Sequence, residues 1–138
     1  MSGEASIELA LPARPESLTI VRQALSGLAE AGGWNSTFLT DAKIALSEAC
    51  SNVVVHAYPD GTDGTLTVMM TLQGNDLIVV VRDHGVGIVP RISSRGAGLG
   101  LGLPLIAALT NEVRVRSADD GHTEVMMIFA IPNNGDER

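Results

Sequence analysis

Three polar residues, Glu48, Asn52 and His56, are spaced four residues apart in LSEACSNVVVHAY, a segment typical of a helix. Residues at this spacing lie on one helix face, so a carboxylate and an amide become neighbours. The amide oxygen of Asn52 suits Mg²⁺, which binds substrate phosphates. Glu48, one turn earlier, can orient or deprotonate a water or hydroxyl that attacks a γ-phosphate. His56 lies where the predicted helix ends, and interaction with the helix dipole is its favoured interpretation.

A second group of residues, in RDHGVGI, places a carboxylate beside two glycines at the end of an apolar segment. Asp83 can accept a hydrogen bond from an exocyclic amine, such as the 6-amino group of adenine. Gly85 and Gly87 allow a tight turn and a close approach of the backbone to a flat ligand. An ordinary turn capped by aspartate would contain the same residues, so the motif alone leaves both interpretations open.

A glycine-rich segment, GAGLGLGLPLIAAL, leads directly into a predicted helix. Gly96, Gly98, Gly100 and Gly102 alternate there with small or aliphatic residues. Backbone N–H groups at a helix N-terminus bind anions, and glycines let phosphate oxygens reach them. A flexible connection is the alternative. The Walker phosphate loop and the G-x-G-x-x-G motif are both absent, so a bound phosphate would be held in another way.

The predicted elements indicate how these residues are positioned. Strands are expected at 6–12, 65–72, 76–83, 112–118 and 122–131, and helices at 15–33, 37–57 and 103–110. Strands grouped in hairpins favour an α+β fold, with a mixed, mostly antiparallel sheet and helices on one face. Period-two alternation places Thr123 on the same strand face as the apolar Val125 and Met127.

Composition limits the class of protein. The chain has 138 residues, 45% of them hydrophobic, and a formal net charge of −7. This length predicts a single domain over 1–138, and scattered arginines with one lysine argue against nucleic acid as a partner. Cys50 is the only cysteine, and His84 and His122 lack ligand-like spacing, so neither a disulfide nor a zinc site is expected. Without a signal peptide or an apolar run of about 20 residues, a cytoplasmic protein that does not span a membrane is expected.

Four motifs, SEACSNVVVHAY, RDHGVGI, GLGLGLPLI and GHTEVMMI, occur in the order and spacing of the GHKL ATPases. The chain resembles that superfamily over about residues 5–131, which would be its ordered core. Within it, the pattern E-A-x-x-N-x-x-x-H-A-Y is typical of the anti-sigma-factor serine kinases. The resemblance implies the Bergerat ATP-binding fold, a two-layer α/β sandwich, and the use of ATP and Mg²⁺.

The resemblance also implies a role for individual residues. Glu48 would be the catalytic base and Asn52 the Mg²⁺ ligand. Asp83 would bind adenine, assisted by Gly87 and, through water, by Thr123. The full set of nucleotide-binding residues that it implies is Asn52, Asp83, Gly85, Gly87, Ile88, Arg95, Gly98, Leu99, Gly100, Leu101, Gly102 and Thr123.

The segment IVPRISSRGA, between Gly87 and Gly98, is a short lid compared with many members of the family. A lid normally closes over the nucleotide and excludes water, so its length bears on affinity and on the rate of transfer. Arg91 or Arg95 can neutralise charge on the γ-phosphate, and a solvated loop arginine is the equal alternative.

The function that the resemblance implies is that of an ATP- and Mg²⁺-dependent serine kinase. It would sequester a sigma factor and phosphorylate an anti-anti-sigma partner of the STAS type, and a homodimer is expected. Phosphorylation would add charge at the partner's interface and release that partner. The alternative is an ATP- or ADP-gated protein-binding module without kinase activity, since the binding motifs are complete but the lid is short. A structural α/β domain whose glycines are only turns is a third, weaker interpretation.

Overall fold

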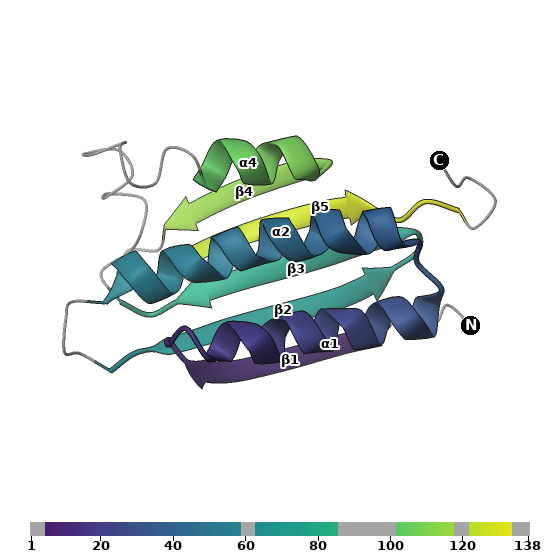
Figure 1. The fold of residues 1–138 in the computed structure, drawn as a ribbon. Coiled ribbons are helices and arrows are strands. Elements are labelled where there is room, and N and C mark those ends of the chain that lie inside the picture. The colour runs from purple at the N-terminus through teal and green to yellow at the C-terminus, as the bar shows by residue number, and fades with distance from the viewer. Residues whose placement is uncertain (1–4, 59–62, 86–101, 118–121, 134–138) are drawn as a thin grey trace.

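The computed structural model describes residues 5–58, 63–85, 102–117 and 122–133 (Figure 1). Five strands and three α-helices make up these residues, with one π-helical turn, η1. In chain order the elements are β1 (Ala5–Pro12), α1 (Ser17–Gly32), α2 (Ser36–Asn52), η1 (Val53–Ala57), β2 (Thr65–Gln73), β3 (Asp76–Asp83), α4 (Gly102–Leu109), β4 (Glu112–Ser117) and β5 (Thr123–Ala130). Each predicted helix and strand is present, with bounds that differ by a few residues.

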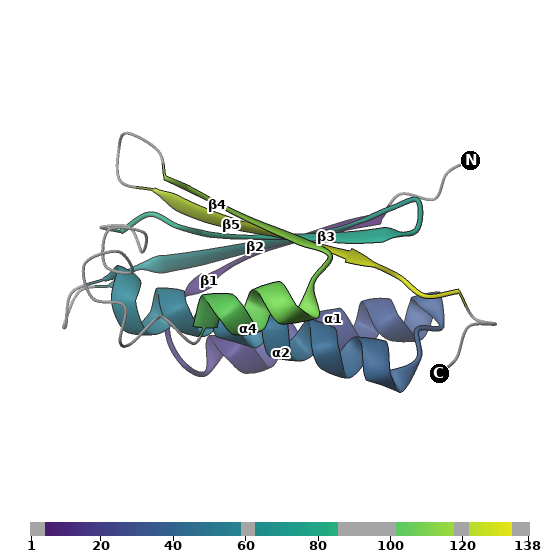
Figure 2. The same cartoon turned by 90° about the horizontal axis from the view of Figure 1, so that it is seen from above.

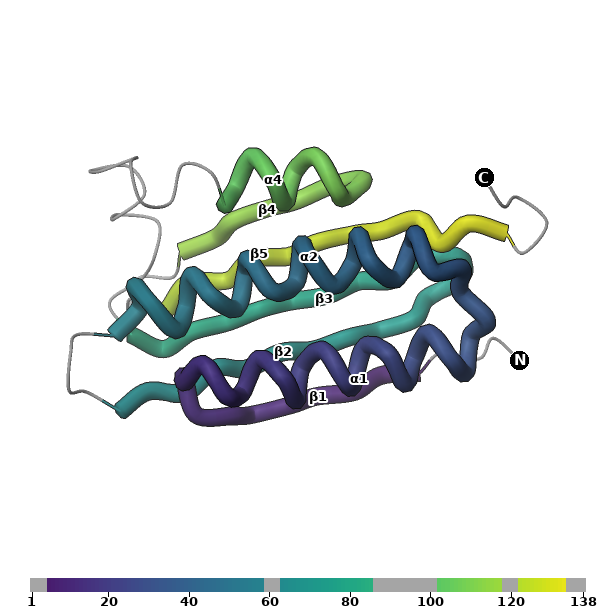
Figure 3. Tube along the Cα trace, in the orientation of Figure 1, coloured from purple at the N-terminus to yellow at the C-terminus, as the bar shows by residue number. Residues whose placement is uncertain are grey.

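The strands form one sheet in the order β1-β2-β3-β5-β4. Each of the four pairings between described strands is antiparallel. The three helices lie together on one face of this sheet, which gives two layers (Figure 2). Helix α2 lies between α1 and α4 and crosses the middle of the sheet (Figure 3). The α+β, two-layer fold predicted from the sequence is therefore confirmed.

The core lies between the two layers. Along β2, β3 and β5, every second residue is buried, as expected for a sheet with one covered face. Buried side chains of the helices, among them Leu25, Leu46 and Ile106, pack against this face. The same alternation continues to the strand ends, where polar residues take the buried positions: Asp83 ends β3 and Thr123 begins β5.

Local chemistry explains two helix boundaries. The side chain of Asn35 caps α2 by accepting a hydrogen bond from the N–H of Phe38 at 2.7 Å. Gly33, at φ 68°, ends α1 in the left-handed conformation. The helix predicted over 37–57 changes at Val53 into a π-helical turn, which the sequence pattern did not indicate. None of the helices in the described residues is long and apolar enough to cross a membrane.

Candidate active site

Four element ends meet at one end of the molecule, on the left in Figure 1. They are the C-terminal ends of α2 and β3 and the N-terminal ends of α4 and β5. Helix α2 carries Glu48 and Asn52, both half-buried, and β3 ends at Asp83. The topology therefore brings to this end the carboxylates and the amide that the sequence analysis selected.

Asp83 is fully buried, and its partner across the β3–β5 ladder is the buried Thr123. One carboxylate oxygen, Oδ1, accepts a hydrogen bond from the N–H of Gly85 at 2.9 Å. The other, Oδ2, is buried and has no hydrogen-bond partner among the described residues. Buried polar atoms are nearly always paired in proteins, so an unpaired carboxylate oxygen indicates a place for a hydrogen-bond donor of a ligand.

The surroundings of Asp83 act on its pKa in opposite directions. Burial disfavours the charged form and is the strongest influence, so the pKa of the Asp83 carboxyl is raised above its ordinary value. The Gly85 N–H and the nearby His84 and His122 act the other way and favour the carboxylate. A ligand that donates a hydrogen bond to Oδ2 would favour the carboxylate further.

The start of α4 lies directly against the predicted catalytic pair. A Cβ atom added to Gly102 would be 3.1 Å from Asn52 Nδ2 and 3.6 Å from Glu48 Oε1. Only glycine lets the helix approach this closely without displacing the amide. The first N–H groups of α4 have no partner within the helix and can bind an anion. The structure therefore brings the N-terminus of α4 beside a carboxylate and an amide, and the role of this helix end in binding phosphate stays a prediction.

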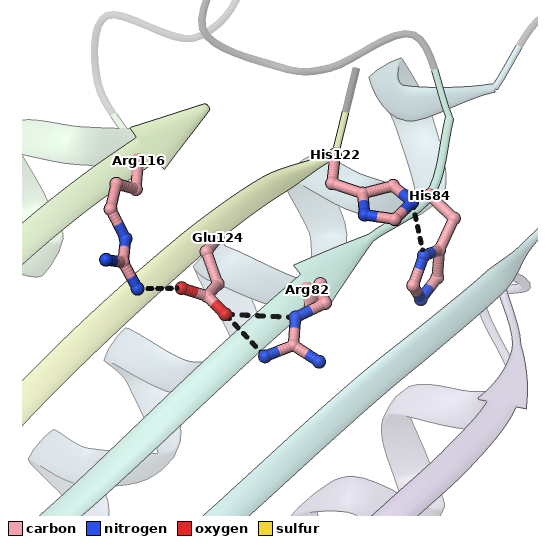
Figure 4. A network of polar contacts seen from close by, with 5 residues as sticks. All are labelled: Arg82, His84, Arg116, His122 and Glu124. Atoms are coloured by element: carbon pink, nitrogen blue, oxygen red, sulfur yellow. Dashed lines mark hydrogen bonds and ion pairs between the residues drawn. The ribbon is translucent and has the colours of Figure 1, made fainter. Parts of the chain in front are cut away.

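Two histidines 38 positions apart in the sequence also meet here. His84 Nδ1 and His122 Nε2 are 2.9 Å apart, at hydrogen-bonding distance (Figure 4). The sequence alone does not predict this contact, because it depends on strand register: the two histidines flank Asp83 and Thr123, which are ladder partners. Among the described residues, no group of three or more His, Cys, Asp or Glu side chains could hold a metal ion.

The outer face of the sheet carries a charged network beside these histidines (Figure 4). Glu124 Oε2 accepts a hydrogen bond from Arg82 Nε at 3.0 Å, and Oε1 accepts one from Arg116 Nη2 at 2.9 Å. These bonds, first that of Arg116 and then that of Arg82, hold the pKa of Glu124 below its ordinary value. A pocket of about 440 Å³ is lined by Arg82, His84, Arg116, Ser117, His122 and Glu124.

Cys50 and His56 belong to the same sequence motif as Glu48 and Asn52. Cys50 is buried, and loss of hydration raises the pKa of its thiol to about 12, so it behaves as a small apolar side chain. His56 lies half-buried in the last turn of η1, at the end of the helical segment as predicted.

Seven of the predicted nucleotide-binding residues lie outside the described residues. They are Gly87, Ile88, Arg95, Gly98, Leu99, Gly100 and Leu101. The lid segment with Arg91 lies there as well, so the roles of all these residues stay predictions.

Comparison with known families agrees with this fold. Residues 11–129 match the family model of the histidine kinase-like ATPase domain. The chain therefore belongs to the histidine kinase-like ATPase family, which confirms the family expected from its motifs.

Relatives within the family are more specific. The chain is 36% identical over 136 residues to the serine-protein kinase RsbW of Bacillus licheniformis, with 89% of this chain and 84% of the relative covered. It is also 36% identical over 124 residues to the serine-protein kinase RsbW of Bacillus subtilis strain 168, with 80% and 78% covered. These relatives confirm the enzyme class predicted from the sequence, a protein serine kinase.

One solved structure has a similar fold. The crystal structure of the RsbU and RsbW domains of Rv1364c from Mycobacterium tuberculosis aligns with a TM-score of 0.73 at 22% sequence identity. The alignment covers 92% of this chain and 32% of that chain, so it supports the fold alone.

Proposed function

We propose that this chain is a cytoplasmic anti-sigma factor that uses ATP and Mg²⁺ to phosphorylate a serine of a STAS-type anti-anti-sigma protein. When that partner is unphosphorylated, the chain would bind it and release its sigma factor. The serine kinase relatives support the type of reaction. The observation that carries the proposal is the buried, unpaired Oδ2 of Asp83, at the end of the sheet where Glu48 and Asn52 also lie.

Recognition of adenine follows from the chemistry of that oxygen. A carboxylate oxygen only accepts hydrogen bonds, so it favours a base with an amino group at the 6 position over one with a carbonyl oxygen. Thr123 lies across the ladder from Asp83 and is buried on the same side. Gly85 follows with a backbone that can approach a flat base closely.

The residues of α2 fit the magnesium ion that the family implies. The amide oxygen of Asn52 is a hard ligand of the kind that Mg²⁺ accepts, and Glu48 lies one turn away on the same face. When bound, Mg²⁺ would neutralise charge on the β- and γ-phosphates. The N-terminus of α4, held against Asn52 at Gly102, would bind phosphate oxygens through its N–H groups.

Transfer of the phosphoryl group then requires a base. Glu48 would take the proton from the partner's serine hydroxyl as the serine oxygen bonds to the γ-phosphorus. The bond between that phosphorus and the β,γ-bridging oxygen breaks, and ADP leaves with the electron pair. The phosphoserine carries nearly two negative charges at neutral pH, which changes the partner's interface and releases it.

A phosphorylation assay tests this proposal. Wild type, Glu48→Ala and Glu30→Gln would be incubated with γ-labelled ATP, Mg²⁺ and a purified STAS-type protein encoded by the same organism. Glu30 is an exposed glutamate on α1, so its variant controls for a change of charge on a helix. Labelled phosphoserine is expected with wild type and Glu30→Gln.

With Glu48→Ala, transfer should fall about 10²- to 10⁴-fold, while ATP binding measured by calorimetry stays unchanged. Full transfer by Glu48→Ala would remove Glu48 from the mechanism. Binding of ATP by wild type without any phosphoserine on the partner would favour the nucleotide-gated binding module instead.

A further inference from the structure

Tyr58, the residue directly after η1, joins three segments of the chain through one hydroxyl group. Its O–H donates to the carbonyl oxygen of Thr65 at 2.6 Å. The same oxygen accepts hydrogen bonds from the N–H of Thr65 at 3.1 Å and from the N–H of His84 at 2.9 Å. A tyrosine hydroxyl has one proton and two lone pairs, so these three bonds use its full capacity.

The ring of Tyr58 also fixes the spacing of these segments. A Cβ atom added to Gly64 would lie 2.3 Å from the ring, and one added to Gly85 would lie 2.8 Å from it. At Gly85 the added atom would also be 2.2 Å from the carbonyl oxygen of Ala57. The backbones before β2 and after β3 therefore close against the ring at distances that only glycine allows.

These contacts bear directly on the orientation of Asp83. The two N–H groups that follow Asp83 are both held: Tyr58 binds that of His84, and Asp83 Oδ1 binds that of Gly85. The direction of the remaining oxygen, Oδ2, depends on both bonds, because together they fix the backbone on which the carboxylate is mounted. Tyr58 thus acts on the free oxygen without touching it.

Tyr58 also belongs to the helical segment that carries the catalytic pair. It follows Asn52 by six residues, with only the π-helical turn Val53–Ala57 between them. A bond from Tyr58 to His84 therefore ties the end of α2 to the loop after β3. The distance from Asp83, the carboxylate proposed for adenine, to Asn52 and Glu48, proposed to act at the phosphates, depends on this bond.

We propose that Tyr58 is a positioning residue of the nucleotide site. Its hydroxyl holds the loop that aims Asp83 Oδ2 at the adenine amino group, in register with the helix that carries Asn52 and Glu48. This inference rests on the proposed function, since it assigns the free oxygen of Asp83 to adenine. It requires no contact between Tyr58 and the nucleotide.

The test uses Tyr58→Phe, which keeps the ring against Gly64 and Gly85 but removes all three hydrogen bonds. ATP and inosine triphosphate would be titrated calorimetrically into the variant and into wild type. ATP affinity should fall about five- to tenfold, and affinity for inosine triphosphate should change about twofold or less. The selectivity ratio is the decisive quantity, because a general loss of stability lowers both affinities equally.

Asn111→Ala is the matched control. Asn111 Oδ1 accepts a hydrogen bond from the N–H of Ala130 at 2.7 Å, and Ala130 pairs with Asp76 at the opposite end of β3. This variant also loses a bond from a side chain to the backbone, but it should keep the wild-type selectivity ratio. Wild-type selectivity in Tyr58→Phe, or an equal change in both variants, would overturn the inference.

A second variant keeps the test decisive if Tyr58→Phe does not fold. Gly85→Ala should push the loop off Ala57 and the ring, and reduce selectivity for ATP in the same direction; unchanged selectivity in this variant would contradict the inference. Asp83→Asn separates this inference from the proposed function. Loss of selectivity in Asp83→Asn but not in Tyr58→Phe rejects the role of Tyr58 alone. Wild-type selectivity in Asp83→Asn rejects the assignment of adenine to Asp83.

Discussion

Asp83 and Glu124 are carboxylates at the same end of the sheet, on the neighbouring strands β3 and β5, and they lie on opposite faces. Asp83 faces the helices, is fully buried and leaves one oxygen unpaired among the described residues. Glu124 faces outward and bonds through both oxygens to Arg82 and Arg116. Burial raises the pKa of Asp83, whereas the two arginines lower that of Glu124.

The difference distinguishes two uses of a charged side chain. A carboxylate with all its partners in place, such as Glu124, adds a modest amount to stability. A buried carboxylate oxygen without a partner costs stability and persists where a ligand supplies the missing donor. Asp83 and Glu124 lie on neighbouring strands and point to opposite faces of the sheet, so the inner position is the candidate for binding and the outer one contributes to folding.

The largest expected effect that separates the two carboxylates is on ATP binding. Asp83→Asn presents an amide in place of the free oxygen and should weaken ATP binding about 100-fold or more. Glu124→Gln should leave ATP affinity within about twofold, because its bonds lie on the other face. Calorimetric titration of ATP into both variants measures this. Equal ATP affinities of the two variants would show that the two carboxylates do not differ in nucleotide binding.

A smaller effect on ATP binding is expected at the N-terminus of α4. Gly102 lies there, close to Glu48, which is the third carboxylate at this end of the molecule after Asp83 and Glu124. Gly102→Ala places a methyl group 3.1 Å from Asn52 Nδ2, so the helix end or the amide must shift. Binding of ATP in the presence of Mg²⁺ should weaken about tenfold, which is the effect of losing about 1.4 kcal/mol. Titration with and without Mg²⁺ tests this, and a loss that is the same without Mg²⁺ would place the effect outside the metal site.

Asp83→Asn should also stabilise the protein without nucleotide, by about 1 kcal/mol at pH 7, because it removes a buried charge. The sign of the pH dependence follows from the raised pKa. The folded state binds a proton more readily, so the free energy of unfolding of wild type falls as the pH rises from the ordinary aspartate value of 3.8 through the folded pKa.

The free energy of unfolding of Asp83→Asn, measured with denaturant over this pH range, should therefore lack that decrease. The advantage of the variant should disappear below about pH 3.8, where the aspartate is protonated in both states. A variant that is less stable than wild type at pH 7 would show that the charge is compensated in some other way.

The smallest expected effect belongs to Glu124→Gln, which should destabilise the protein by about 0.5–1 kcal/mol at pH 7. Here the pKa is lowered, so the stabilisation is complete above the ordinary glutamate value of 4.5 and is lost as the pH falls through the folded pKa. The difference between wild type and Glu124→Gln should shrink over that window. In the same unfolding series, a difference that grows as the pH falls would contradict the assigned role of the arginines.

Much of the site could be predicted from local pattern. The four-residue spacing placed Glu48 and Asn52 on one helix face, and strand alternation placed Thr123 on the same face as the apolar Val125 and Met127. Both inferences need only the geometry of a single element. The sequence also indicated that α4 would begin after glycines, although it did not show that Gly102 packs against Asn52.

What the sequence could not show depends on contacts between distant segments. The pair of His84 and His122 follows from the register of β3 on β5, which strand patterns alone do not determine. The three bonds of Tyr58 depend on the π-helical turn before it, which propensities do not indicate. Both features lie close to Asp83, so the parts of the site that were missed are contacts between distant segments around the carboxylate.

The proposed site depends on the free oxygen of Asp83 as the acceptor for the adenine amino group. The most direct test is calorimetric titration of ATP and inosine triphosphate into the wild-type protein, since inosine triphosphate carries a carbonyl oxygen in place of the 6-amino group, with a proton on the adjacent N1. The account predicts that ATP binds about 100-fold more tightly or better, because a carbonyl oxygen facing a buried carboxylate leaves both acceptors unpaired. Equal affinities for the two nucleotides would contradict it.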